Sequence, residues 1–269
     1  MDQSVGLNTS DRRRAVENLS GFVAASVKVG RASEAPFYHL EFDRVFPPEI
    51  YERILANKPV YEDYRPMSGR SKGHVREDGV ATRVKIDLFP ELIRGLPTQK
   101  RDVWNLVGKA LCSRPVQDAF VRRLAPPLEK RFEKNYAKTG FYPIPILTRD
   151  IPGYEIQPHT DTRWKGITVQ FYLPDNNDST HIGTIFHSVA ADATLPQHCK
   201  MKFARNSGYA FAVGTDTWHS ADPVDNSVET RDSILLTYFV DKGVLPILKN
   251  RTKRLGNLVR AEYAKLVRR

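Results

Sequence analysis

Hydrophobic positions divide the chain into a first half with helical spacing and a second half of short, alternating runs. Pro47-Pro48 predicts a helix that continues to about Asn57, and residues 98–138 have helical spacing in two pieces separated at Pro126-Pro127. Residues 37–46 alternate as a strand does. Further along, β-branched and aromatic runs lie between turn residues, and they predict strands at 144–149, 154–159, 166–173, 183–187, 201–204, 209–213 and 233–240.

Many short strands at close spacing predict a mainly β protein with flanking helices. The architecture that fits this pattern is a jelly roll with the N-terminal helices packed on one of its sheets. Residues 1–35 are polar and irregular and predict a poorly ordered lead-in, and residues 61–85 predict a long charged loop. Residues 36–269 predict a single domain, with a core at about 144–240, helical support at about 48–138 and a C-terminal helix at about 246–269.

Composition narrows the class of protein. Of the 269 residues, 41% are hydrophobic, which is enough for a substantial core and too many for a disordered chain. No run approaches the roughly 18 apolar residues that a membrane helix requires, so no membrane partner is expected. An arginine run at 12–14 precedes an apolar stretch at 21–27, but a glutamate and an asparagine intervene, which argues against an export signal. These features predict a cytoplasmic protein.

The net charge is +10, and its distribution bears on the choice of partner. Residues 1–150 carry 26 Lys and Arg against 19 Asp and Glu, residues 151–240 carry 6 against 10, and residues 241–269 carry 9 against 2. The predicted core is therefore mildly acidic. A basic C-terminal helix can steer an anionic partner such as nucleic acid, or it can pack its apolar stripe against the core. The second interpretation is favoured, so nucleic acid is not the expected partner, and the helix offers a contact for a homodimer.

One segment of the strand region carries metal-ligand chemistry. Side chains two residues apart share a face of an extended chain, so His159 and Asp161 can present an imidazole and a carboxylate to one point. With His219 from a distant strand, they would complete the 2-His-1-carboxylate set of non-haem Fe(II) enzymes. A His-x-Asp/Glu triplet also arises by chance, as residues 39–41 show, and the alternative is a hydrogen-bonded structural histidine.

A second pattern strengthens the metal interpretation. Arg231 and Ser233 follow His219 by 12 and 14 residues, and they lie on one face of the next expected strand. A guanidinium can bind a carboxylate through two hydrogen bonds, and a neighbouring hydroxyl adds a further donor. Such a clamp would hold the far end of a metal-chelating 2-oxo diacid. The triplet at 205–207 has the same form after another histidine, but it precedes no comparable strand.

The ordered pattern His-x-Asp…His…Arg-x-Ser, over about residues 144–240, resembles the Fe(II)/2-oxoglutarate-dependent oxygenases of the prolyl-hydroxylase-like type, which fold as a double-stranded β-helix. The resemblance implies that His159, Asp161 and His219 bind Fe(II). It also implies that Arg231 and Ser233 hold the distal carboxylate of the cosubstrate 2-oxoglutarate. The implied enzyme converts 2-oxoglutarate and O2 into succinate and CO2 while it hydroxylates a C–H bond of its substrate.

Three further residues are candidates for the same site. Tyr172 stands where prolyl-hydroxylase-like members have a tyrosine that touches 2-oxoglutarate, and the alternative is an ordinary strand aromatic. Alternation puts Thr168, Gln170 and Tyr172 on one strand face, which we take as the face lining the site, so Gln170 is a candidate substrate contact. Arg149, ten residues before His159, is a candidate to point inward at substrate or cosubstrate.

Differences between this chain's motifs and those of other branches of the superfamily narrow the class of substrate. Halogenating members replace the carboxylate that Asp161 provides here. Nucleic-acid demethylases of the AlkB type carry Arg-x-Asn-x-Thr-x-Arg after the last histidine, whereas residues 231–237 of this chain contain no asparagine. A small-molecule substrate is therefore the expectation. Two alternatives stay open, namely hydroxylation of a protein side chain and a non-catalytic jelly-roll binding module.

Overall fold

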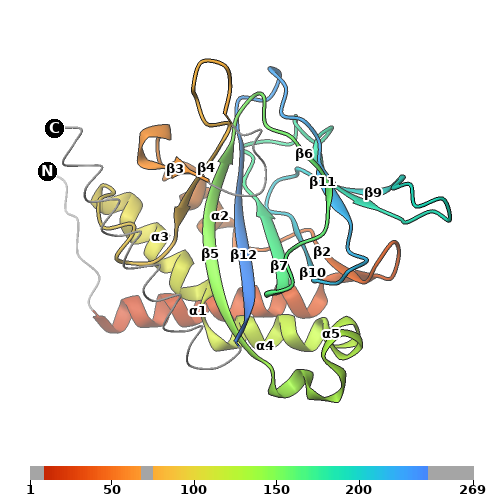
Figure 1. Ribbon diagram of the computed structural model, residues 1–269. Helices are drawn as coiled ribbons and strands as arrows, with labels where there is room; N and C mark the ends of the chain where they lie inside the picture. The colour runs from red at the N-terminus through yellow and green to blue at the C-terminus, as the bar shows by residue number, and fades with distance from the viewer. Residues whose placement is uncertain (1–8, 68–74, 242–269) are drawn as a thin grey trace, which may run out of the picture.

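The computed structural model describes residues 9–67 and 75–241, within which two antiparallel sheets face each other (Figure 1). The larger sheet consists, in spatial order, of β1 (Arg31–Ser33), β2 (His39–Phe42), β10 (Gly208–Ala212), β7 (Lys165–Tyr172), β12 (Arg231–Asp241), β5 (Gly140–Asp150), β4 (Arg83–Asp87) and β3 (Arg65–Pro66). The smaller sheet consists of β6 (Ile156–His159), β11 (His219–Ala221), β8 (Gly183–His187) and β9 (Gln197–Lys202). The predicted mainly β, jelly-roll architecture with helices on one sheet is confirmed in these residues.

The longest strands, β5 and β12, pair along their whole length near the middle of the larger sheet, and Arg231 lies opposite Asp150. Because side chains alternate between the two faces of a strand, each strand of this sheet directs some side chains toward the smaller sheet and others toward the helices. In β7, Thr168 and Gln170 face the smaller sheet and line a cavity, while Val169 and Phe171 pack in the core on the other side. The predicted polar inward face of this strand is therefore confirmed.

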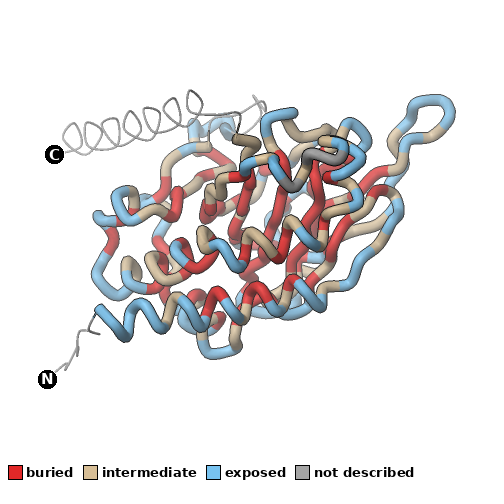
Figure 2. The backbone as a smooth tube through the Cα atoms, turned by 90° about the horizontal axis from the view of Figure 1, so that it is seen from below, coloured by how far each residue is buried: buried red, intermediate tan, exposed pale blue. Residues whose placement is uncertain are grey.

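Helices cover the outer face of the larger sheet: α1 (Thr9–Val29), α2 (Pro48–Ala56), α3 (Thr98–Leu111), α4 (Arg114–Arg123) and α5 (Ala125–Phe132). Two short 3₁₀ helices, η1 (Tyr61–Asp63) and η2 (Glu133–Lys138), follow α2 and α5 in the chain. Trp104 and Phe120 are fully buried between the helices and the sheet. Viewed from below, the helices lie in front of the strands, and buried residues concentrate where the two layers meet (Figure 2). No helix in the described ranges has the length and apolar character that crossing a bilayer requires.

A second, aromatic core fills part of the space between the two sheets. Phe186 of the smaller sheet packs edge-to-face on Tyr209 and Phe211 of the larger sheet, with ring centroids 5.2 and 5.7 Å apart. Aromatic pairs in this geometry add a favourable electrostatic contribution to the burial of their surface. These contacts fix the spacing of the sheets at one side of the cavity described below.

The expectation of an irregular lead-in over residues 1–35 is wrong for its described part. Residues 9–29 form α1, which packs against α3 and α4 and buries Leu19, Val23 and Val27. The apolar residues of this helix recur at three- and four-residue spacing among many polar ones, so the segment is polar overall although one face of it is buried. The predicted C-terminal helix at 246–269, with its homodimer contact, lies outside the described residues. The single-domain division remains a prediction.

Two further local predictions need correction. Residues 61–85 are not one long loop, because η1, β3 and the first part of β4 lie within them. Pro126-Pro127 does not separate two helical pieces but lies in the first turn of α5, where a proline ring is tolerated because no hydrogen-bonding N–H is lost. The helical region is interrupted instead between α3 and α4 and at Leu124. The helix predicted from Pro48 to about Asn57 is confirmed as α2.

Candidate active site

His159, Asp161 and His219 form a cluster at one end of the space between the sheets. β6 and β11 pair antiparallel with His159 directly opposite His219, which places both imidazoles on one face with ring centroids 4.4 Å apart. Asp161 lies two residues beyond the end of β6. One ligand atom from each residue lies within 4.8 Å of the other two, and no other such group of three occurs in the described ranges. The predicted constellation is thus brought together by the fold.

Hydrogen bonds orient both histidines as metal ligands. Nδ1 of His159 lies 2.9 Å from the carbonyl oxygen of Gln157, and Nδ1 of His219 lies 3.0 Å from that of Thr217. A carbonyl can only accept, so each Nδ1 carries the proton and each Nε2 keeps a free lone pair. Burial lowers the pKa of His219 to about 4 and also lowers the pKa of His159. Both rings are therefore neutral at pH 7, as metal coordination requires.

Two side chains of β7 position the carboxylate. Lys165 Nζ donates to Asp161 Oδ1 at 2.5 Å, and Thr168 Oγ1 donates to Asp161 Oδ2 at 2.5 Å. Burial by itself would raise the pKa of Asp161, but the charge of Lys165, the charge that His219 gains when it is protonated in acid, and these hydrogen bonds outweigh it, and the pKa is lowered. The carboxylate is ionised at pH 7. Two imidazole nitrogens and one carboxylate oxygen form the donor set of a facial triad, so these residues fit Fe(II) with open coordination positions.

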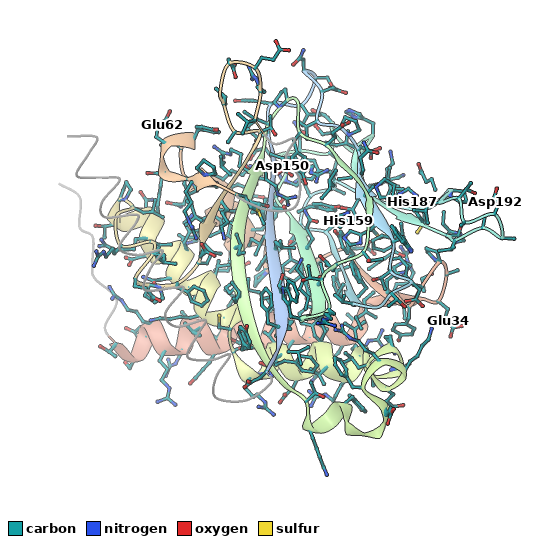
Figure 3. All side chains as sticks on the ribbon, in the orientation of Figure 1. Glu34, Glu62, Asp150, His159, His187 and Asp192 are labelled. Carbon is teal, nitrogen blue, oxygen red and sulfur yellow. The ribbon has the colours of Figure 1, made fainter. Side chains whose placement is uncertain are left out.

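The triad lines a cavity of about 820 Å³ between the two sheets. Arg231 also lines it and is 1% exposed. Its Nε and Nη2 each lie 3.2 Å from Asp150 Oδ2, and its Nη1 donates to the carbonyl oxygen of Gly183 at 3.3 Å. Figure 3 shows Asp150 at the end of β5 and His159 on the facing sheet. The cavity therefore has metal-ligand chemistry on one sheet and a buried guanidinium on the other.

Ser233 and Gln170 belong to one hydrogen-bonded network beside Arg231. Gln170 Nε2 donates to Ser233 Oγ at 2.8 Å, and Ser233 Oγ also lies 2.8 Å from Thr148 Oγ1. The Gln170 carbonyl oxygen accepts from the Tyr209 hydroxyl at 2.7 Å. Gln170 lines the cavity, whereas Ser233 is fully buried beneath it. Gln170 is thus at the site in the predicted strand position, and hydrogen bonds hold both the nitrogen and the oxygen of its amide.

Two residues predicted at the site, Tyr172 and Arg149, do not line the cavity. The Tyr172 hydroxyl donates to Thr184 Oγ1 at 2.8 Å within the aromatic core, and Tyr209 is the tyrosine of this network that lines the cavity. The inward orientation predicted for Arg149 is wrong. Arg149 lies on the opposite face of β5 from the cavity, donates to Asp232 at 2.7 and 3.0 Å and stacks over the Tyr64 ring. Neighbouring side chains of a strand point to opposite faces, so Arg149 points away from the cavity that Asp150 faces.

The cavity residues that the sequence did not indicate as site residues include Arg83, Tyr154, Lys165 and Tyr209. Lys165 could have been found from its four-residue spacing to Asp161 at the start of a strand. Arg83 lies in the segment that was assigned to a loop, so no strand face could be given to it. Tyr154 and Tyr209 have no local signal, because their roles arise only when distant strands pair.

The fold is shared with a solved hydroxylase. No family model and no curated protein sequence matches the chain. A prolyl hydroxylase from Trichoplax adhaerens, solved with a hypoxia-inducible-factor peptide fragment, is similar in structure, with a TM-score of 0.51 at 11% identity over 87% of this chain and 94% of its own. The chain has the fold of that hydroxylase. The fold expected from the sequence resemblance is therefore confirmed.

Two bacterial proteins also match in structure. A prolyl 4-hydroxylase from Pseudomonas putida has a TM-score of 0.48 at 13% identity, over 82% of this chain and 98% of its own. A 2-oxoglutarate-Fe(II) oxygenase family protein from Burkholderia pseudomallei has a TM-score of 0.45 at 15% identity, over 84% of this chain and 92% of its own.

Proposed function

We propose that this protein is an Fe(II)/2-oxoglutarate-dependent oxygenase that hydroxylates an unactivated C–H bond of a small molecule. The observation that carries the proposal is the convergence of the His159, Asp161 and His219 ligand atoms within 4.8 Å, in a cavity that Arg231 also lines. A metal triad and a buried guanidinium in one cavity suit a keto acid that chelates the metal and ends in a carboxylate.

Each residue has a role that its contacts support. The triad would hold the metal through two Nε2 atoms and one carboxylate oxygen, while Lys165 and Thr168 orient that carboxylate. Arg231, held by Asp150, would bind the distal carboxylate of 2-oxoglutarate. When bound, iron and 2-oxoglutarate would supply the activation of O2 and the transfer of one oxygen atom to the substrate.

The network beneath the cavity gives Ser233 a different role from the predicted direct contact. Its hydroxyl holds the Gln170 amide, and Gln170 is the residue that faces the cavity. We assign Ser233 to positioning and Gln170 to ligand contact. Leu235 and Phe239 line the same cavity and give part of it an apolar wall.

An anaerobic titration tests the proposal. Fe(II) and 2-oxoglutarate added to the metal-free protein should give a weak charge-transfer band at roughly 520–530 nm, because the keto acid chelates iron in an open site. Asp161→Ala and His219→Ala should abolish the band. Glu41→Gln, which alters the chance triplet at residues 39–41, should leave it unchanged. A wild-type protein that binds no Fe(II) would contradict the proposal and favour the non-catalytic binding module.

A second candidate, hydroxylation of a protein side chain, is favoured by one observation. A second cavity of about 890 Å³ adjoins the first, and the two share the segment Thr160–Thr162 and Trp164 as a common wall. An extended peptide could occupy both cavities, and the similar Trichoplax adhaerens enzyme was solved with a peptide. Stimulation of 2-oxoglutarate turnover by peptides, but not by small amino acids or sugars, would select this candidate.

A further inference from the structure

A second arginine converges on the carboxylate that holds Arg231. β4 and β12 pair with opposite sides of β5, and both Arg83 and Arg231 lie directly opposite Asp150. Residues opposite each other in a sheet project from the same face, so the three side chains point together toward the cavity. Both arginines line it.

The contacts place the two guanidinium groups around one point. Arg83 Nε lies 3.2 Å from Asp150 Oδ1, while Arg231 binds Oδ2 of the same carboxylate at 3.2 Å. The guanidinium carbons of Arg83 and Arg231 lie 4.8 and 5.4 Å from the centroid of the Tyr154 ring. Arg83 also donates to the Tyr154 hydroxyl. One carboxylate and one aromatic ring therefore position both cations.

The charges of this cluster do not balance. Two arginines face a single carboxylate, in a region where Asp150 and Arg231 are almost fully buried and the Arg83 side chain is 12% exposed. A buried cation without a partner anion is costly. Arg83 Nε and Asp150 Oδ1 are also buried without a well-directed hydrogen bond among the described residues. One further carboxylate would neutralise the cluster and give the guanidinium groups an acceptor.

We propose that Arg83 is a second arginine of the site for the distal carboxylate of 2-oxoglutarate, and that Arg83 and Arg231 together select dicarboxylate over monocarboxylate keto acids. This inference rests on the proposed function. A substrate anion is the less favoured partner, because Arg83 shares both Asp150 and Tyr154 with the arginine that the proposed function assigns to the cosubstrate.

The test compares two keto acids that differ only at the distal end. 2-Oxoglutarate and 2-oxopentanoate share the chelating head, but the second ends in a methyl group. Their dissociation constants are measured anaerobically on the Fe(II)-loaded protein from the charge-transfer band and by calorimetry. Arg83→Gln should weaken 2-oxoglutarate binding at least tenfold and change 2-oxopentanoate binding less than twofold, because only the former has a carboxylate for Arg83 to bind.

Arg149→Gln is the matched control. Arg149 is a largely buried arginine with its own carboxylate partner on the opposite face of the same sheet, so its loss reproduces the cost of removing a buried ion pair without touching the cavity. It should leave both dissociation constants unchanged. Arg83→Lys, which keeps the charge without the planar fork, should give a selective loss of at least threefold for 2-oxoglutarate. If Arg83→Gln does not fold, the selectivity of Arg83→Lys decides whether the proposal holds.

The outcomes separate the two proposals. An unchanged preference for 2-oxoglutarate in the Arg83 variants, with the band intact, overturns the role of Arg83 and leaves the proposed function standing. An equal loss for both keto acids also overturns it, because it shows a structural effect. A wild-type protein that gives no band with either keto acid refutes the proposed function and the inference together.

Discussion

At the residue scale, a metal-binding histidine differs from a structural histidine in the groups that surround its second ring nitrogen. His39 and His159 both start a His-x-acid triplet, and both place Nδ1 beside the carbonyl oxygen two residues earlier. Nε2 of His39 then lies 3.8 Å from Glu41 of its own triplet, inside a packed aromatic core. Nε2 of His159 instead lies near His219 and Asp161. The triplet alone could not distinguish these cases, because pairing with a distant strand supplies the third ligand.

Glu41 provides a test of the structural interpretation. Its pKa is lowered from 4.5 to about 2, chiefly by the His39 ring; burial opposes the shift, and Arg31, which donates to it at 2.7 Å, supports it. A carboxyl group whose folded-state pKa is depressed stabilises the fold above its unfolded pKa, and this contribution is lost as the pH falls from about 4.5 to about 2. Because Arg31 is exposed, we expect Glu41→Gln to cost only about 1 kcal/mol at pH 7.

Urea denaturation at pH 7 and pH 3 measures this effect. The difference between wild type and Glu41→Gln should be smaller at pH 3 than at pH 7. Glu17→Gln, which removes an exposed ion pair with Arg13, should show a difference near zero at both pH values. A Glu41 difference that does not depend on pH would contradict the depressed pKa.

At the scale of elements, the sequence predicted what depends on short-range pattern and missed what depends on tertiary context. The strands that carry His159, Gln170 and Arg231 were expected within a few residues of their observed bounds, because alternation and turn residues mark them locally. β4 was missed because it begins within a charged segment; in the fold it pairs with β5 and β3 and buries Val84 and Ile86 in the core. As a result, Arg83, which begins this strand, was not recognised as a site residue.

Helix α1 allows a prediction at this scale. Leu19 is 2% exposed in the core that supports the larger sheet, so Leu19→Ala leaves a cavity and should lower the free energy of unfolding by about 2–4 kcal/mol. Val29→Ala, at the end of the same helix and 84% exposed, should change it by less than about 0.5 kcal/mol. Denaturant unfolding of both variants checks this. Equal, small effects would show that α1 does not belong to the cooperative core.

At the scale of the whole molecule, the candidate site joins the two sheets. His159 and His219 belong to the smaller sheet, while Arg231 and Arg83 belong to the larger one, and the cavity separates them. A metal held by one sheet and chelated by a keto acid whose far carboxylate is held by the other would therefore cross-link the sheets. A ligand that binds only the folded state stabilises it by RT ln(1 + c/Kd), where c is the free ligand concentration, so the stabilisation grows with the logarithm of the ligand concentration above the dissociation constant.

Metal and cosubstrate together should thus raise the thermal midpoint by more than the sum of the shifts that each gives alone. At about 100 times the dissociation constant, binding adds about 2.7 kcal/mol, which corresponds to roughly 5–10 °C for a domain of this size. Anaerobic scans with Fe(II), with 2-oxoglutarate and with both should show this excess, and EDTA should reverse the metal-dependent part. In Asp161→Ala the excess should disappear while the midpoint without ligands still reports a folded protein. Additive shifts from the two ligands would instead place them at independent sites, because only a chelate that spans the cavity couples one sheet to the other.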